Sequence, residues 1–144
     1  MRQIYETDSS LEAERKVVQD LCDKWKVDCA KLPISYNVDY CLLNDGKLRA
    51  WLEVKCRYCT SVEYPTYFIS AKKIFNGLQM SEASGVPFIL AVRWEDKLGF
   101  IRVLKGSYEI KIGGRKDRND WQDVEPMAHF NIKDFTMIEV GDAG

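Results

Sequence analysis

The chain has 144 residues, of which 46% are hydrophobic and 30% are charged, and its formal net charge is −1. This composition predicts one soluble globular domain over residues 1–144, and it excludes a membrane span because no apolar run approaches about 20 residues. The N-terminus has no signal-peptide pattern, so we expect a cytoplasmic protein. The near-neutral charge gives no overall attraction to nucleic acid, although a local basic surface can suffice for binding.

The first predicted element is a helix that begins near Ser9 or Ser10 and ends at Trp25 or Val27. Its apolar side chains form one stripe, and Glu14 lies within that stripe. A carboxylate on the buried side of a helix is costly unless it is paired or coordinated. Glu14 therefore either lies at the exposed N-terminal end of the stripe or completes a metal site, directly or through water.

Residues 37–57 predict two β-strands joined by a tight turn at residues 44–47. Alternate residues of a strand share a face, so Glu53 and Lys55 should project side by side, about 6.6 Å apart along the strand. Asp39 on the neighbouring strand comes within reach of them if the hairpin register places it on the same face. The intervening residues of the second strand are apolar and can be buried on the other side.

Two carboxylates and one ammonium group at one place on a sheet indicate a catalytic site. Two carboxylates a few ångströms apart repel each other unless a cation lies between them, and Mg²⁺ takes such oxygen ligands together with waters and phosphates. A nearby ammonium can orient a water molecule or neutralise charge on a phosphoryl group. Asp39, Glu53 and Lys55 thus have the components for metal-assisted phosphodiester hydrolysis. The alternative is an exposed strand face that carries a salt bridge.

After an irregular segment, residues 67–69 lead into a second predicted helix that Ser70 caps and Gly85 ends in the left-handed conformation. Lys72 and Lys73 occupy its first turn, where cations oppose the helix dipole, so they indicate either an outside anion such as phosphate or ordinary solvated lysines. The side chains expected to bury one side of this helix are Ile74, Phe75, Leu78 and Ala83.

The remaining chain predicts strands. Residues 86–94 form a nearly continuous apolar run that fits a strand covered on both faces, and residues 100–104 return beside it. Further strand-like pieces at 108–112 and 127–132 flank a polar loop, and residues 134–140 should close the domain as a helix turn or an edge strand. The loop is either a substrate-contacting finger or a solvated hairpin tip, and its basic residues are Arg115, Lys116 and Arg118.

The Asp39 and Glu53-Val54-Lys55 pattern resembles the active-site hairpin of the PD-(D/E)xK nuclease superfamily, except that Val38 stands where the pattern has Pro. Glu14-Arg15 is similar to the first helix of archaeal-type Holliday junction resolvases, in which this Glu contributes to the catalytic site. The resemblance covers about residues 9–104. It implies an α/β fold with a central mixed β-sheet flanked by helices, a restriction-endonuclease-like αβββαβ core, followed by a C-terminal β extension over about 105–144.

The resemblance also implies an Mg²⁺-dependent endonuclease, in which Mn²⁺ can substitute, that hydrolyses DNA in recombination, repair or phage DNA processing. The form of the substrate stays open, because branched or junction DNA, single strands, nicked or linear duplex and a specific restriction site all suit this catalytic core. Asp39, Glu53 and the Val54 carbonyl would hold the metal, Lys55 would position the attacking water, and Glu14 would support the ion. The cations expected to contact DNA are Arg57, Lys72, Lys73, Arg115, Lys116 and Arg118.

Two alternatives from other classes remain open. One is a nucleic-acid-binding or assembly module that keeps the fold without cleavage, and the other is a metal-dependent phosphoesterase that acts on nucleotides. The complete set of Asp, Glu and Lys argues against the first. As partners we expect DNA and, for junction cleavage, a second copy of the chain in a homodimer, with no membrane and no small-molecule cofactor.

Overall fold

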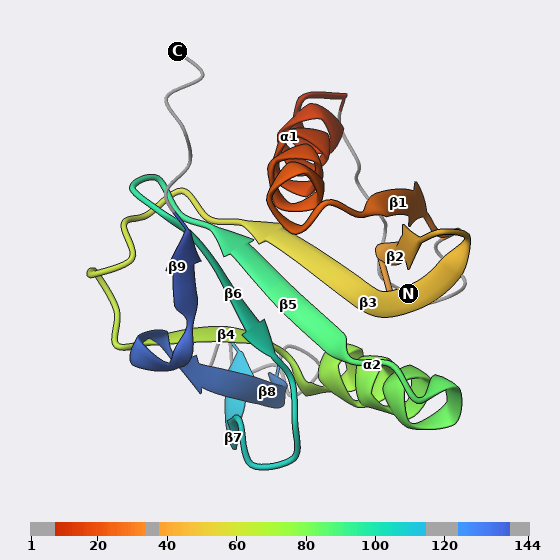
Figure 1. Cartoon of the computed structure of the whole chain (residues 1–144). Coiled ribbons are helices and arrows are strands. Elements are labelled where there is room, and N and C mark those ends of the chain that lie inside the picture. The colour runs from red at the N-terminus through yellow and green to blue at the C-terminus, as the bar shows by residue number, and fades with distance from the viewer. Residues whose placement is uncertain (1–7, 34–37, 115–123, 139–144) are drawn as a thin grey trace.

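The computed structural model describes residues 8–33, 38–114 and 124–138 (Figure 1). It is a mixed α/β structure in which a six-stranded sheet, two helices and a three-stranded sheet pack together, which confirms the predicted fold class. Within the described ranges, neither helix is apolar enough over a sufficient length to cross a bilayer. In chain order the elements are α1 (Asp8–Trp25), β1 (Asp28–Lys31), β2 (Tyr40–Asn44), β3 (Lys47–Cys56), β4 (Thr66–Ser70), α2 (Ala71–Ser84), β5 (Phe88–Arg93), β6 (Leu98–Arg102), β7 (Glu109–Gly114), β8 (Val124–Asn131), the 3₁₀ turn η4 (Ile132–Asp134) and β9 (Thr136–Ile138).

The larger sheet has the strand order β1-β2-β3-β5-β6-β9. Its central pair, β3 and β5, is parallel, and the other neighbours are antiparallel. The parallel pair is joined through α2, as a crossover between parallel strands requires. Helix α1 covers one face of this sheet, whereas α2 and the three-stranded sheet lie on the other (Figure 1). The central strands are therefore buried on both faces, as the apolar run at 86–94 predicts.

Helix α1 ends at Trp25 as predicted and begins at Asp8, close to the predicted start. Its stripe of apolar side chains packs on the sheet, where Val18 and Leu21 belong to one buried cluster with Leu52 and Val54 of β3. Each of these four side chains is at most 2% exposed. Because side chains alternate along a strand, burial of Leu52 and Val54 under α1 turns Glu53 toward the opposite face of the sheet.

The β2–β3 hairpin is the element that brings Asp39 to Glu53. Asp45 and Gly46 have φ angles of +53° and +74°, which are the left-handed values of the two-residue turn that the sequence predicts. A β-bulge between Leu42 and Leu43 then shifts the strand register by one residue, and Tyr40 pairs with Leu52. One step further along this register Asp39 faces Glu53, and antiparallel residues that face each other lie on the same side of a sheet.

Helix α2 packs closely on β5 because Gly77 has no side chain. A Cβ atom at Gly77 would lie 2.2 Å from the Phe88 ring, so the glycine permits this approach. Gly85 ends the helix with φ +78°, as predicted, but Ser70 makes no side-chain capping hydrogen bond. Two predicted core positions are wrong: Phe75 is 46% exposed and Ala83 is exposed.

The three-stranded sheet, of order β4-β8-β7, was not predicted as a unit. The segment at 67–69, expected only to lead into a helix, is strand β4 and pairs with β8 of the C-terminal region. Ala128 and Phe130 of β8 are fully buried and share a cluster with Leu90 of β5. Strand β9 is an edge strand beside β6, in agreement with the prediction for the end of the chain. Arg115, Lys116 and Arg118 lie outside the described residues.

Candidate active site

Asp39 and Glu53 meet at the point where the pairing of β2 with β3 ends. The Val54 N–H donates a hydrogen bond of 3.1 Å to Asp39 Oδ2, which fixes this carboxylate beside the backbone of β3. The Glu53 side chain is 0% exposed, an unusual position for an ionisable group. The two acids therefore converge on the face of the sheet that lies beneath α2, as the hairpin pattern predicts.

The pKa values of the two acids move in opposite directions. Burial raises the pKa of Glu53 to about 8, and the hydrogen bond and negative charge of Asp39 add to this effect, while Lys73 and Lys55 oppose it. Burial also acts to raise the pKa of Asp39, but the hydrogen bonds from Glu53 and from the Val54 N–H lower it below the ordinary value. In the metal-free protein the pair thus holds one proton near neutral pH, which Glu53 donates to Asp39.

Two lysines approach Glu53 from different elements. Lys55 Nζ lies 3.9 Å from Glu53 Oε2, and its side chain is 40% exposed, so the amine extends from the buried acid toward solvent. Lys73 Nζ on α2 lies 3.4 Å from both Glu53 oxygens. The sequence indicated that Lys72 and Lys73 either face an outside anion such as phosphate or are ordinary solvated lysines, and in the structure the group beside Lys73 is the Glu53 carboxyl. Lys72 is exposed.

The donor set at this position fits a hard divalent cation. A strand residue directs its N–H and C=O toward the same neighbour, so the Val54 carbonyl points toward Asp39 as the Val54 N–H does. Two carboxylates and one carbonyl are oxygen ligands, which Mg²⁺ prefers. Within the described ranges, no three side chains of His, Cys, Asp and Glu cluster in a way that could hold a metal. A cation here would rest on Asp39, Glu53 and the Val54 carbonyl, and this ligand set stays a prediction.

Glu14 is placed away from the Lys73 side of the sheet. It belongs to α1, which covers the face opposite Glu53, and its Oε2 lies 3.7 Å from Lys31 Nζ. The Lys31 amine lies 4.9 Å above the Tyr40 ring. Burial raises the pKa of the Tyr40 hydroxyl, and the charge of Glu14 adds to that rise. The role of Glu14 in supporting a metal ion stays a prediction.

Arg57 continues the line of Glu53 and Lys55 along the same face of β3, because its N–H extends the β3–β5 ladder to Arg93. Its guanidinium donates a 2.8 Å hydrogen bond to the Phe68 carbonyl and lies 4.7 Å from the centre of the Tyr67 ring. Arg57 is therefore held in place beside the site. Contact of Arg57, Lys72 and Lys73 with DNA stays a prediction.

Sequence reasoning missed the position of Lys73. The available signal was its place in the first turn of the second helix, where a cation is unfavourable unless an anion lies nearby. Which group lies beside Lys73 depends on how α2 packs across β3. This packing follows from the absence of a side chain at Gly77 and the burial of Ile74. Such tertiary placement cannot be read from local spacing.

An acid at the end of one strand, Glu-x-Lys on the next, and a mixed sheet covered by helices define a nuclease of the PD-(D/E)xK class. Residues 1–138 match the protein family described as "Phage putative PDDEXK endonuclease", and the chain belongs to this family. Among curated proteins, none matches the sequence.

The fold also matches a solved structure, that of Hjc, a Holliday junction resolvase from the hyperthermophilic archaeon Archaeoglobus fulgidus. The TM-score is 0.58 at 14% sequence identity, and the match covers 90% of this chain and 93% of the resolvase chain. At this identity the likeness establishes the fold. It agrees with the resemblance that Glu14-Arg15 and the hairpin suggest.

Proposed function

We propose that this protein is a divalent-metal-dependent endonuclease that hydrolyses DNA phosphodiester bonds, preferably in branched DNA. The observation that carries the proposal is the convergence of Asp39 and Glu53, with the Lys55 amine 3.9 Å from the Glu53 carboxyl. The family supports nuclease chemistry, and the resolvase neighbour favours a branched substrate.

Each group in the site has a chemical role. Asp39, Glu53 and the Val54 carbonyl would hold Mg²⁺ or Mn²⁺, which when bound neutralises charge on the phosphodiester. The Lys55 amine orients the attacking water and stabilises negative charge on the phosphoryl oxygens as the bond breaks. Lys73 offsets the charge of the buried Glu53 when its proton leaves. Lys72 is exposed on the first turn of α2 and would contact the DNA backbone.

The test is cleavage of labelled DNA in four forms, namely linear duplex, single strand, flap and four-way junction, with Mg²⁺ or Mn²⁺. We expect Lys55→Ala to cut at least about a hundredfold more slowly, because a positioned acid, base or charge contributes about that much. Lys47→Ala is the matched control, since this exposed lysine lies at the other end of β3 and should leave the rate unchanged.

Two outcomes would contradict the proposal. Equal rates for Lys55→Ala and wild type would remove Lys55 from the mechanism. Binding of DNA by the wild type without cleavage of any form in either metal would favour the non-catalytic module. If the protein cuts four-way junctions on two opposed strands, two active sites are needed, and hence a second copy of the chain.

A further inference from the structure

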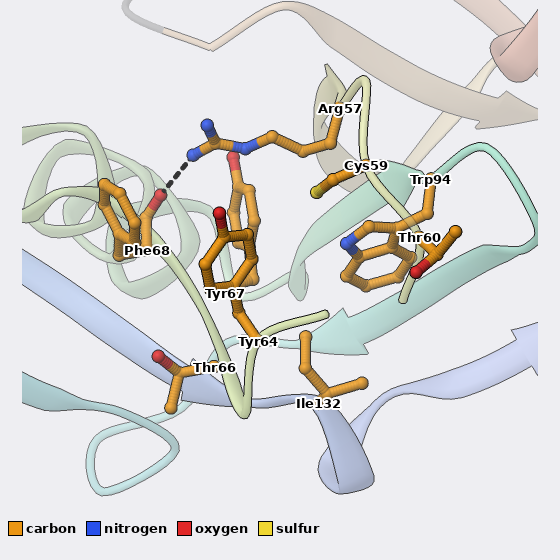
Figure 2. A pocket seen from close by; sticks show the side chains of 9 residues that line it. All are labelled: Arg57, Cys59, Thr60, Tyr64, Thr66, Tyr67, Phe68, Trp94 and Ile132. Atoms are coloured by element: carbon orange, nitrogen blue, oxygen red, sulfur yellow. Dashed lines mark hydrogen bonds between the residues drawn. The ribbon is translucent and has the colours of Figure 1, made fainter. Parts of the chain in front are cut away.

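A pocket of about 300 Å³ opens at the end of β3, beyond the active-site residues (Figure 2). Arg57, which lines it, is two residues from Lys55 and lies on the same face of the strand. The volume is at the lower end of the range for small-molecule sites, so it accommodates one planar ring system rather than a length of chain. Neither the family description nor the catalytic residues account for this pocket.

Aromatic rings make up much of the pocket wall. Tyr67 and Trp94 are buried, and their rings meet edge to face with centroids 6.3 Å apart. Tyr64 is 62% exposed and adds a third ring that the solvent can reach. Figure 2 shows Arg57 reaching across one side of the pocket to the Phe68 carbonyl, with Trp94 and Thr60 on another side. Flat apolar surfaces with a few polar groups suit a heterocycle with polar edges.

The loop that carries Tyr64 is fixed in position. Ser61, 5% exposed, donates its N–H and its hydroxyl to the two Asp96 carboxylate oxygens, each over 2.7 Å. The Glu95 N–H donates to the Cys59 carbonyl over 3.0 Å. These bonds tie the loop to the turn between β5 and β6, so the pocket exists before a ligand arrives. A preformed site loses less conformational freedom on binding.

We propose that this pocket receives one unpaired nucleobase of the DNA strand being cut. The inference rests on the proposed function, since it is the neighbouring catalytic site that brings a DNA strand here. Stacking on aromatic side chains is the usual way in which proteins hold unpaired bases, and the Arg57 charge suits the backbone of the entering nucleotide. The pocket thereby selects flaps, bulges and branch points, where a base is free to enter, over continuous duplex.

The test uses the fluorescent base 2-aminopurine at one unpaired position of a flap and at the matching paired position of a duplex, with Ca²⁺ replacing Mg²⁺ to prevent cleavage. We expect the wild type to quench the flap signal. Tyr64→Ala should weaken flap binding about tenfold and leave duplex binding unchanged, because it removes one stacking surface. Tyr58→Ala is the matched control: Tyr58 is an 86% exposed tyrosine of the same loop that does not line the pocket.

Equal flap affinities for Tyr64→Ala and Tyr58→Ala would overturn the inference. A dimer that Tyr64→Ala dissociates, measured by sedimentation, would also overturn it, because the pocket would then hold a second copy of the chain. The two proposals fail separately. Cleavage of flap and duplex with a preference that Tyr64→Ala does not alter refutes the base pocket alone, whereas quenching that depends on Tyr64 without any cleavage refutes the nuclease alone.

Discussion

At the scale of single residues, the most informative group is Glu53, a fully buried carboxyl. A buried charge is normally excluded from a core because desolvation is costly. Here the protein offsets that cost by keeping the Glu53 carboxyl protonated, with its proton donated to Asp39, and by placing the Lys73 amine at 3.4 Å. This buried pair of acids contributes little to stability. It suits a site in which a metal cation can replace the proton between the two carboxyl groups.

The raised pKa of Glu53 predicts how stability depends on pH. In EDTA, the folded state keeps the Glu53 proton up to about pH 8, whereas the unfolded chain releases it near the ordinary pKa of 4.5. The free energy of unfolding should therefore fall as the pH rises from about 5 to 8, by at most about 1.4 kcal/mol per pH unit. Urea unfolding at unit intervals of pH measures this slope.

Glu53→Gln should lose that part of the slope, because the amide does not titrate, while Glu82→Gln on the exposed side of α2 should keep it. The comparison with wild type is needed because the pKa of His129 is lowered, mainly by burial, and its titration acts in the opposite direction. Identical pH profiles for wild type and Glu53→Gln would show that Glu53 is ionised in the folded protein throughout this range.

Sequence reasoning placed Asp39, Glu53 and Lys55 correctly because strand alternation and turn chemistry are local rules. It could not place Lys73 or define the surroundings of Glu14. Both lie on helices, and the face of the sheet that a helix covers depends on packing between distant segments. Phe75 was assigned to the core for the same reason: helical spacing identifies a stripe, but the width of the stripe that is covered depends on the neighbouring elements.

At the scale of elements, the contact between α2 and β5 determines where Lys73 lies. Gly77→Ala should destabilise the protein by about 1–3 kcal/mol, because the new Cβ would overlap the Phe88 ring and force a shift. The better helix propensity of Ala, about 1 kcal/mol, would oppose this loss without cancelling it. Thermal unfolding with Asn76→Ala as the control in the preceding position measures the difference.

Stabilisation by Gly77→Ala would mean that Phe88 moves aside freely. If α2 shifts as expected, the Lys73 amine moves away from Glu53, and the variant should also cut DNA more slowly than Asn76→Ala does. The packing of α2 on β5 thus affects the position of Lys73 in the site. An isolated glycine in a helical sequence pattern gives only a weak indication of such a contact.

At the scale of the whole molecule, the C-terminal strands belong to the core. The sequence suggested a nuclease core that ends near residue 104 and a β extension behind it. In the structure, Phe130 of β8 is 0% exposed and packs in the same cluster as Val92 and Trp94. The pairing of β4 with β8 joins segments about 60 residues apart, and no local pattern reveals such a partner.

Phe130→Ala should therefore lower the free energy of unfolding by about 3–5 kcal/mol, since it removes a buried ring and leaves a cavity. Phe75→Ala, at a 46% exposed ring, should cost much less. Chemical denaturation of both variants measures the contrast. Equal losses would indicate that residues beyond 104 are an independent appendage.

The bulge between Leu42 and Leu43 determines which face of the sheet Asp39 occupies. Regular pairing from the turn onward would set Asp39 against Leu52 and leave the acid pointing at the underside of α1, while the one-residue step aligns it with Glu53. Tyr40 and Leu42 are buried in the hydrophobic cluster beneath α1, and their packing there holds the strand in this shifted register. Substitutions that disturb this apolar packing, on the face of the sheet away from the site, should therefore abolish cleavage before they unfold the protein. We expect inactive but folded variants at such positions, although these positions do not contact the substrate.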